Sequence, residues 1–424
     1  MRALVFRTDD TGVSWYRVRI PVGEIARQGA AEIVTTPTMM PIQLFARSPS
    51  EADQASAAAA RALYESISQG ADILHTQRVV QYEPFGVFNA IRFAKGIPWV
   101  IDVDDNVLDL DPANPAFDTY RVREEHECYE SRELTNPSQC GPDEIPLSRT
   151  DGAVLAVKQT KVDIRSMTIE QLVSADAIFT STTDLANLYG NLARTSGRNP
   201  LIYVLPNSLD LPLWDSVAKP QDHHGEIWVG WAGSASHAAD VEILAPVMDE
   251  VLAANKNVRF FWTKLESPRL LALHKKYGRR AVMYDGWVRA EEWANYYTAM
   301  NFDISLGPLN DTPFNRGKSN LKWLESGVLG QSFVCSDVGP YTCIKHGRDG
   351  FRCKRPTQWI RAINSLVASE TMRRDVGGRA RERVRAEFDI KNNCHLWVEA
   401  YEDIVKRRGE ACKKRSKELV VSDK

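Results

Sequence analysis

The feature that most constrains this chain is an alternation of short apolar runs with helix-like stretches, which occurs in two successive series. Each apolar run is rich in Val, Ile and aromatic residues and is too short for a helix, so it predicts a buried strand. Strands that alternate with helices form βαβ units around a parallel sheet. The proline-punctuated segment 209–225 interrupts the alternation. Because 424 residues also exceed what one hydrophobic core organises, the sequence predicts two α/β domains.

The predicted domains are Rossmann-like units that face each other across a cleft, with C-terminal helices closing the structure. The first is expected at 1–208 with a polar insertion at about 106–150, the second at 209–400, and a helix end with a basic tail at 401–424. Parallel sheets bind ligands at the carboxyl ends of their strands, so the chemistry is expected in loops that follow strands. The main predicted strands are 2–7, 71–77, 97–105, 226–233, 258–264, 281–287, 302–309 and 331–337.

Charge and cysteine content narrow the class of function. No stretch approaches the roughly 20 apolar residues of a membrane span. The seven cysteines are scattered without metal-ligand spacing, so we expect a cytoplasmic protein with reduced thiols and no metal site. The whole chain carries a formal charge of −2, yet from residue 316 onward 24 Lys and Arg stand against 14 Asp and Glu. This asymmetry predicts an anionic ligand for the C-terminal half, either a nucleotide diphosphate or nucleic acid. Nothing in the sequence indicates an oligomeric state.

The strongest candidate site is a loop that enters a predicted helix at about residue 319. Lys318, Lys322 and Glu325 are spaced four and three residues apart, so they share one helical face. The free N–H groups of the helix start, with Arg316 and Lys318, would hold a diphosphate and stabilise it as it leaves. Glu325 would accept hydrogen bonds from ribose hydroxyls. The alternative is a surface ion pair between Lys322 and Glu325.

A second candidate loop follows the predicted strand 226–233. Gly233 and Ser234 are small, which lets backbone N–H groups approach a phosphate closely. His237 follows within reach of the same space, although a histidine here could equally cap a helix or pack. Together the two loops predict one nucleotide-binding site in the second domain.

The first domain offers a third loop, GVSWYRVRIP, directly after its first strand. Gly12, Tyr16 and Arg17 would then stand at the cleft, with Gly12 and Arg17 at the donor and Tyr16 at the acceptor. Arg17 could contact a phosphate or form a surface salt bridge.

A fourth candidate is the carboxylate group that ends the predicted strand 97–105. Asp102, Asp104 and Asp105 repel one another unless a cation or an exchanging proton uses them. Asp104 or Asp105 could orient or deprotonate an acceptor hydroxyl. Two alternatives remain: an Asx-rich helix cap, and a D-x-D metal motif formed by Asp102 and Asp104 that would bind a divalent ion.

The C-terminal half resembles the GT-B glycosyltransferases, and among them the retaining family-four enzymes. The resemblance covers roughly 200–405, and its motifs occur in the order GWAGSASH, YDGWVRAEEWANYYTAMNFDISLGPL and KSNLKWLESGVLGQSFVCSDVGPYTCIKHGRDGF. It implies that Glu325 binds the ribose, that the Gly233–Ser234 loop meets the diphosphate, and that Gly286 lies beside the base. The chain departs from the family at Gly317, where the family often has a donor-sugar glutamate.

The phosphate loop also departs, because Ser234 and Ala239 stand where the family often has Arg and Lys. The density of Arg316, Lys318 and Lys322 would compensate. This departure leaves the sugar and the retaining or inverting outcome open.

Two segments of the N-terminal half resemble bacteriophage-encoded members of the group: the loop 12–21 and the stretch DPANPAFDTY after VIDVDDN. Glycine in the first loop leaves room for sugar or acceptor. The resemblance places Asp104 where the wider family has a catalytic histidine. It also makes three residues of or beside the second segment candidates for binding the acceptor; they are Asn114, Tyr120 and Arg121.

The sequence therefore predicts a glycosyltransferase that moves a hexose or pentose from a UDP- or GDP-linked donor to an acceptor hydroxyl, without a further cofactor. A phage-encoded enzyme would work in the host cytoplasm. The acceptor stays open between a 5-hydroxymethylpyrimidine in DNA, flipped out or single-stranded, and a cell-surface glycan or protein. A non-catalytic nucleotide- or nucleic-acid-binding protein is the alternative from another class.

Overall fold

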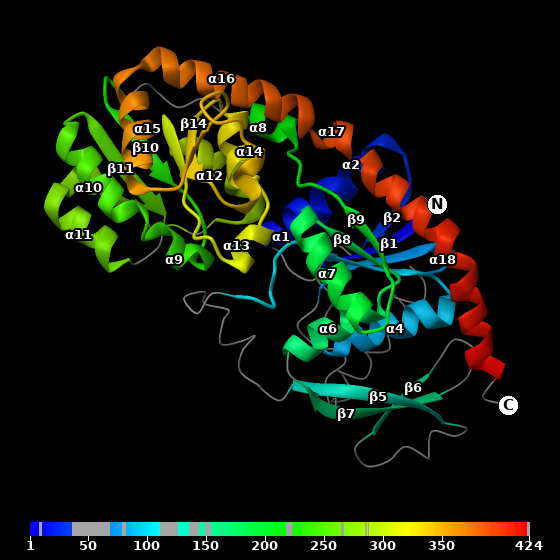
Figure 1. Ribbon diagram of the computed structural model, residues 1–424. Coiled ribbons are helices and arrows are strands. Elements are labelled where there is room, and N and C mark those ends of the chain that lie inside the picture. The colour runs from blue at the N-terminus through cyan, green and yellow to red at the C-terminus, as the bar shows by residue number, and fades with distance from the viewer. Residues whose placement is uncertain are drawn as a thin grey trace. The chain divides into compact units, whose positions relative to one another are not determined.

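A computed structural model describes most of the chain, and many of its elements are labelled in Figure 1. The described residues are 1–7, 11–35, 68–78, 82–110, 126–134, 144–148, 154–162, 164–217, 223–263, 267–284, 286 and 288–421. The predicted Ala-rich helix near residue 60 lies outside them.

The chain divides into two compact units. The first comprises Met1–Val103, Thr119–Leu205 and Cys394–Lys424, and the second comprises Asp104–Asp118 and Pro206–Asn393. The sequence-based expectation was a division into 1–208, 209–400 and 401–424. In the structure the residues Asp104–Asp118 group with the second unit, and the chain from Cys394 onward groups with the first.

The first unit is built on a parallel six-stranded sheet. In sheet order its strands are β2 (Glu32–Thr35), β1 (Arg2–Phe6), β3 (Ile73–Gln77), β4 (Trp99–Val103), β8 (Ala177–Thr180) and β9 (Leu201–Val204). Its helices are α1 (Gly12–Ser14), a π-helical turn (Trp15–Arg19), α2 (Ile20–Gln28), α4 (Tyr82–Lys95), α6 (Ile164–Ser174), α7 (Thr183–Thr195) and α18 (His395–Val421). The central strands are fully buried on both faces, as expected for a parallel sheet covered by helices.

A three-stranded antiparallel sheet, β5-β7-β6, falls only partly within the expected polar insertion at about 106–150, because β7 lies beyond it. Its strands are β5 (His126–Leu134), β6 (Glu144–Ser148) and β7 (Val154–Val162). The sequence did not predict these strands, because charged residues interrupt the alternation of β5.

The second unit holds another parallel six-stranded sheet. In sheet order its strands are β12 (Ala281–Tyr284), β11 (Val258–Thr263), β10 (Ile227–Trp231), β13 (Ile304–Gly307), β14 (Ser332–Ser336) and β15 (Phe351–Cys353). Its helices are α8 (Leu211–Asp215), α9 (Ala238–Val241), α10 (Leu244–Ala254), α11 (Pro268–Tyr277), α12 (Trp293–Ala299), α13 (Pro313–Gly317), α14 (Leu321–Val328), α15 (Pro356–Ala368), α16 (Glu370–Glu387) and α17 (Ile390–Asn393).

Alternating side chains of these strands build the core of the second unit. Val229 and Trp231 of β10 and Phe260 and Trp262 of β11 point to one face, where α10, α11 and α15 cover them. The opposite face receives Tyr297 of α12, whose hydroxyl lies 3.0 Å from Ser305 Oγ in β13. Helices on both faces leave the strand ends as the places where loops can present polar groups.

Candidate functional site

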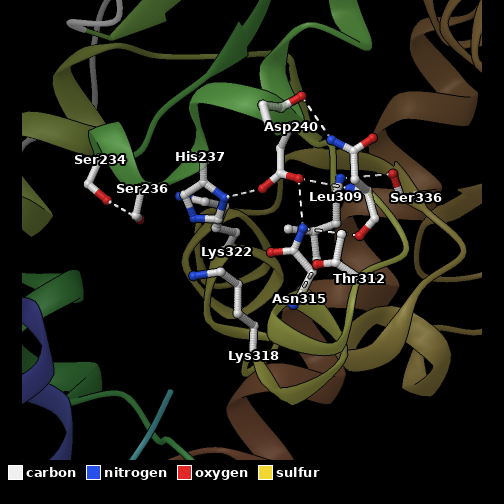
Figure 2. A network of polar contacts seen from close by, with 12 residues as sticks. Ser234, Ser236, His237, Asp240, Leu309, Thr312, Asn315, Lys318, Lys322 and Ser336 are labelled. Atoms are coloured by element: carbon white, nitrogen blue, oxygen red, sulfur yellow. Dashed lines mark hydrogen bonds and ion pairs between the residues drawn. The ribbon is translucent and has the colours of Figure 1, made fainter. Parts of the chain in front are cut away.

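Loops at the carboxyl edge of the second sheet bring a group of polar side chains together (Figure 2). They come from the loop after β10, from α9, and from the segment that joins β13 to α14. The side chains are Ser234, Ser236, His237, Asp240, Asn315, Lys318 and Lys322. Both predicted loops of the C-terminal half therefore contribute to one site.

Asp240 is the centre of this group. It is 3% exposed, and its Oδ1 accepts hydrogen bonds from the Asn310 backbone N–H at 2.8 Å and from Asn315 Nδ2 at 2.7 Å. Its other oxygen lies 2.9 Å from Nδ1 of His237. An ionised Asp240 accepts the Nδ1 proton, which leaves a lone pair on His237 Nε2.

Burial and two neighbouring cations control the protonation of His237. The ring is 7% exposed, and desolvation, followed by the charges of Lys318 and Lys322, lowers the pKa of His237 well below its usual 6.5. The imidazole is therefore neutral at pH 7, and its Nε2 can accept a hydrogen bond from a ligand.

Lys322 reaches from α14 to the end of β10. Its Nζ donates to the Ala232 carbonyl oxygen at 2.6 Å and lies 5.6 Å from the centre of the Trp231 ring. Burial lowers the pKa of Lys322 to about 8, and the charge of Glu325 only partly opposes this shift. A Cβ on Gly233 would lie 2.7 Å from Lys322 Nζ and 2.7 Å from the buried ring of Trp231, and the ring contact favours glycine at this point of the loop.

Gly233 is fixed in turn by Thr263 at the end of β11. Its N–H donates to Thr263 Oγ1 at 2.9 Å, and the same hydroxyl donates to the Gly233 carbonyl oxygen at 2.9 Å. The Gly233 N–H is thus used internally. Ser234 is exposed, and its hydroxyl lies 2.8 Å from that of Ser236.

Lys318 lies beside Lys322 and contacts one of the predicted carboxylates. Its Nζ is 3.6 Å from Asp105 Oδ1 and 4.4 Å from the centre of the Phe314 ring. The Lys318 side chain is 12% exposed, whereas that of Asp105 is 34% exposed. Asp104 precedes it and is also partly exposed. The structure therefore brings Asp105 to the cation cluster.

Glu325 faces inward, with 3% exposure, and its Oε1 accepts a hydrogen bond from Trp293 Nε1 at 2.7 Å. The predicted spacing of Lys318, Lys322 and Glu325 is thus realised with partly and fully buried side chains. It is not a surface ion pair.

Arg316 is placed differently from the prediction. Its side chain is 56% exposed and its Nε pairs with Asp311 Oδ1 at 2.6 Å, because α13 turns this position outward. Gly286 lies against another side chain, since a Cβ there would come within 2.9 Å of Tyr296 Oη.

In the first unit, Arg17 is fully buried and pairs with groups of the fold. Its Nε and one terminal nitrogen donate to the two oxygens of Asp102 at 2.8 and 3.0 Å, and its other terminal nitrogen donates to the Leu205 carbonyl oxygen. The guanidinium carbon lies 5.6 Å from the centre of the Trp397 ring. This internal pairing replaces the predicted phosphate contact. It also occupies both oxygens of Asp102, so the D-x-D metal alternative loses its first ligand.

Burial alone would raise the pKa of Asp102, but the charge of Arg17 and the hydrogen bonds of His75 and Arg17 outweigh it. The pKa of Asp102 therefore lies below its usual 3.8. Nδ1 of His75 lies 2.6 Å from the hydroxyl of Tyr401 in α18, which ties the C-terminal helix to this network.

The remaining predicted residues of the first unit have mixed outcomes. Gly12 begins α1 with open space around it, since a Cβ there would meet nothing within 4 Å. Tyr16 is only 5% exposed, because the π-helical turn directs it into the core, which is a correction to its predicted acceptor contact. Three predicted acceptor residues lie outside the described residues; they are Asn114, Tyr120 and Arg121.

Sequence reasoning missed three partners in the site: Asp240, Thr263 and Trp293. Asp240 had a usable signal, because a His and an Asp three residues apart share one face of a helical turn. Thr263 and Trp293 stand 30 and 32 residues from their partners, and no local pattern links them.

Two features are absent from the residues that the structure describes. No group of three His, Cys, Asp or Glu among them is arranged to hold a metal ion. No helix in that part of the chain has the length and apolar character needed to cross a membrane.

Comparisons with known proteins identify the fold. No family model and no curated protein matches the sequence. Sucrose-phosphate synthase from Thermosynechococcus elongatus matches with a TM-score of 0.60 and 16% identity over 96% of this chain and 99% of that one. HepE from Anabaena, in complex with UDP-glucose, matches at 0.56 and 12% over 95% and 100% of the chains. A glycosyltransferase from Rickettsia africae matches at 0.55 and 11% over 96% and 98%. The predicted fold class is confirmed: two Rossmann-like domains with C-terminal helices, the GT-B fold.

Proposed function

We propose that this protein is a glycosyltransferase that transfers a sugar from a nucleotide-diphosphate sugar to an acceptor hydroxyl. The observation that carries the proposal is the cluster of Lys318, Lys322 and neutral His237 at the carboxyl edge of the second sheet. In open α/β sheets this edge is where ligands bind. The GT-B fold supports the same assignment, because the proteins that share it include one named a glycosyltransferase and one named a sucrose-phosphate synthase.

The two lysines would bind the diphosphate. Lys322 carries a charge at neutral pH, although burial disfavours it, and a bound phosphate would relieve that cost. Both amines would stabilise the negative charge that develops on the leaving diphosphate. Preorganised cations lower a transition-state barrier in this way. The start of α14 adds backbone N–H groups on the same side.

Glu325 and His237 would bind the ribose and the sugar of the donor. Trp293 orients the Glu325 carboxylate, which would accept hydrogen bonds from ribose hydroxyls. His237 Nε2, kept unprotonated by Asp240 on the opposite nitrogen, would accept one from a sugar hydroxyl. Gly286 and Tyr296 would lie beside the base, and the exposed Ser234 beside the phosphates.

Asp105 and Asp104 are the candidate bases for the acceptor hydroxyl. Asp105 is partly exposed and stands next to Lys318, so it is close to the point where the diphosphate would leave. For the acceptor we propose a 5-hydroxymethylpyrimidine in DNA, as a phage-encoded enzyme in a host cytoplasm would use. The excess of Lys and Arg from residue 316 onward favours a polyanion over a neutral glycan.

Calorimetric titration with UDP, GDP and the other nucleoside diphosphates tests the donor site. The wild type should bind UDP or GDP, and Lys322→Met should weaken that binding about 30-fold or more, because a charge-assisted contact contributes about 2 kcal/mol. Glu325→Gln should weaken it about tenfold. Lys345→Met is the matched control, since Lys345 is an exposed lysine of the same unit outside the cluster.

Release of the nucleoside diphosphate from UDP-glucose or GDP-mannose then tests transfer, with hydroxymethylated DNA and a glycan mixture as separate acceptors. Asp105→Asn and Asp104→Asn should slow transfer without changing nucleotide affinity. Failure of the wild type to bind any nucleoside diphosphate, or equal affinity of Lys322→Met and Lys345→Met, would refute the proposed function.

A further inference from the structure

Asp240 joins the two loops that build the proposed donor site. It stands in α9, which follows β10, and its Oδ1 accepts hydrogen bonds from the Asn310 backbone N–H at 2.8 Å and from Asn315 Nδ2 at 2.7 Å. The side chain of Asn310 strengthens this junction, because its Nδ2 donates to the Ala239 carbonyl oxygen at 2.8 Å. The segment that leads from β13 towards Lys318 is therefore held against α9 by a single buried carboxylate and its neighbours.

The hydrogen bonds of Asp240 also fix the tautomer of His237. Two N–H donors meet Oδ1, and such bonds favour the ionised carboxylate. The other oxygen, Oδ2, lies 2.9 Å from His237 Nδ1, and Figure 2 shows one edge of the imidazole turned to it. Because an ionised carboxylate only accepts, Nδ1 carries the ring proton and Nε2 carries a lone pair.

The Nε2 atom of His237 is an acceptor beside two cations. Burial and the charges of Lys318 and Lys322 lower the pKa of His237 well below 6.5, so the ring does not gain a second proton at neutral pH. In the part of the chain that the structure describes, no hydrogen bond reaches this nitrogen. It is thus placed to accept a hydrogen bond from whatever binds between the lysines and the histidine.

The groups of a nucleotide-diphosphate sugar differ in what they offer to such an acceptor. The phosphate oxygens are ionised and only accept hydrogen bonds, so they belong with the lysines and not with Nε2. A hydroxyl group of the sugar can donate. A site built to bond a hydroxyl rejects an analogue that lacks it, because its buried polar group is then left unpaired.

We propose that Asp240 is a positioning residue that sets donor specificity, because it holds His237 in the tautomer that requires a free hydroxyl on the donor sugar. The inference rests on the proposed function, since it takes the anion beside Lys318 and Lys322 to be a diphosphate. Donors that carry the hydroxyl are bound, and donors in which fluorine or a methoxy group replaces it are rejected. Asp240 itself acts through His237 and does not touch the sugar.

Asp240→Asn reverses this polarity and keeps the shape of the side chain. The amide oxygen has to take the place of Oδ1, because an amide nitrogen there would face the N–H donors of Asn310 and Asn315. The amide nitrogen then faces His237 Nδ1 and donates to it, so the ring proton moves to Nε2. In this variant Nε2 is a donor and no longer requires a hydroxyl.

Two measurements on the full chain test the proposal. Nitrogen-15 NMR should place the His237 proton on Nδ1 in the wild type and on Nε2 in Asp240→Asn. Calorimetric titration compares UDP-glucose and GDP-mannose with their monofluorinated analogues, and the wild type should bind at least one analogue about tenfold more weakly than its parent. In Asp240→Asn that ratio should fall below about twofold, while the affinity for UDP or GDP alone should not fall.

Two further variants guard against a merely structural effect. His237→Leu removes the acceptor and leaves Asp240 bonded to both asparagines, so it should also lose the discrimination against fluorine. Asp375→Asn is the matched control, since Asp375 is an exposed carboxylate of the same unit. It should leave the tautomer of His237 and the ratio of affinities as they are in the wild type.

The outcomes separate this inference from the proposed function. A wild type that binds UDP or GDP, yet binds every fluorinated analogue as tightly as its parent, would overturn the inference and leave the donor site in place. So would unchanged discrimination in Asp240→Asn, or a proton on both nitrogens of His237 in the UDP complex, because the ring would then donate to a phosphate. Absence of any nucleoside diphosphate binding would refute the proposed function, and this inference with it.

Discussion

Each unit of this protein buries a positively charged side chain beside the end of a strand, and the two charges are satisfied in opposite ways. Arg17 in the first unit is fully enclosed by the two oxygens of Asp102, the Leu205 carbonyl and the Trp397 ring. Lys322 in the second unit has one backbone carbonyl as its hydrogen-bond acceptor. Within the described residues no carboxylate forms an ion pair with it.

The difference separates a buried charge that the fold itself satisfies from one for which we propose a ligand as the partner. A buried cation with a bidentate carboxylate is complete, and removing either partner leaves an uncompensated charge. A buried cation without an anion is held in a costly state that a bound anion would relieve. The lowered pKa of Lys322, about 8, records that cost, which arises first from burial.

The largest expected effect is the loss of stability when the buried pair of Arg17 and Asp102 is broken. Arg17→Met should lower the free energy of unfolding by about 3–5 kcal/mol, because it leaves the buried Asp102 carboxylate without its countercharge. Because the folded pKa of Asp102 lies below 3.8, the stabilisation from this pair is complete at neutral pH and is lost as the pH falls through the folded pKa. Urea unfolding of the two proteins between pH 3 and 7 measures both effects.

Lys322→Met is the control that could break the comparison. It removes a desolvated charge whose cost of burial the charges of Glu325 and Asp240 only partly offset, so it should leave the free energy of unfolding unchanged or raise it. If both methionine variants lost the same stability, the distinction between a structural and a ligand-binding charge would not hold.

The next effect concerns pH and sharpens the role of Lys322. Above pH 8 the free protein loses the Lys322 charge, so the dissociation constant of the nucleoside diphosphate should rise about tenfold per pH unit. Lys322→Arg should remove this rise, since arginine stays charged. Calorimetric titrations between pH 7 and 10 measure the slope.

The same group predicts the opposite trend for stability without ligand. Between about pH 8 and the ordinary lysine pKa, 10.5, the unfolded chain holds more protons than the folded one, so this group raises the unfolding free energy as pH increases. A pH-independent nucleotide affinity in the wild type would contradict a charged Lys322 in the site.

Much of the fold was predictable because long, buried strands appear in the sequence as apolar runs. The two central strands of each sheet are examples, and the order of alternation gave the two Rossmann-like units. Strand β2, Glu32–Thr35, escaped prediction because it is short and at most half-buried, and β15, Phe351–Cys353, because it has three residues. Strand β5 escaped because charged residues interrupt it.

The site was predictable only where its chemistry is local. The helical spacing of Lys318, Lys322 and Glu325 was visible, and so was Gly233 in the predicted phosphate loop. The contact between Trp293 and Glu325 is not, since it depends on how α12 and α14 pack. The sequence also does not reveal whether a single arginine is buried. Arg17 and Arg316 both follow strands, yet Arg17 is buried against the Asp102 carboxylate and Arg316 is exposed.

The smallest expected effect follows from that contrast. Arg316 was predicted to stabilise the leaving diphosphate, but its side chain is 56% exposed and pairs with Asp311 at the surface. Exposed ion pairs contribute little, so Arg316→Gln should change both nucleotide affinity and kcat/KM less than about threefold. Steady-state kinetics of Arg316→Gln and Lys318→Met measure the contrast, because Lys318→Met should lose far more of its kcat/KM. A loss in Arg316→Gln as large as that in Lys318→Met would mean that Arg316 leaves Asp311 for the ligand, and the boundary between buried and exposed cations would not mark the site.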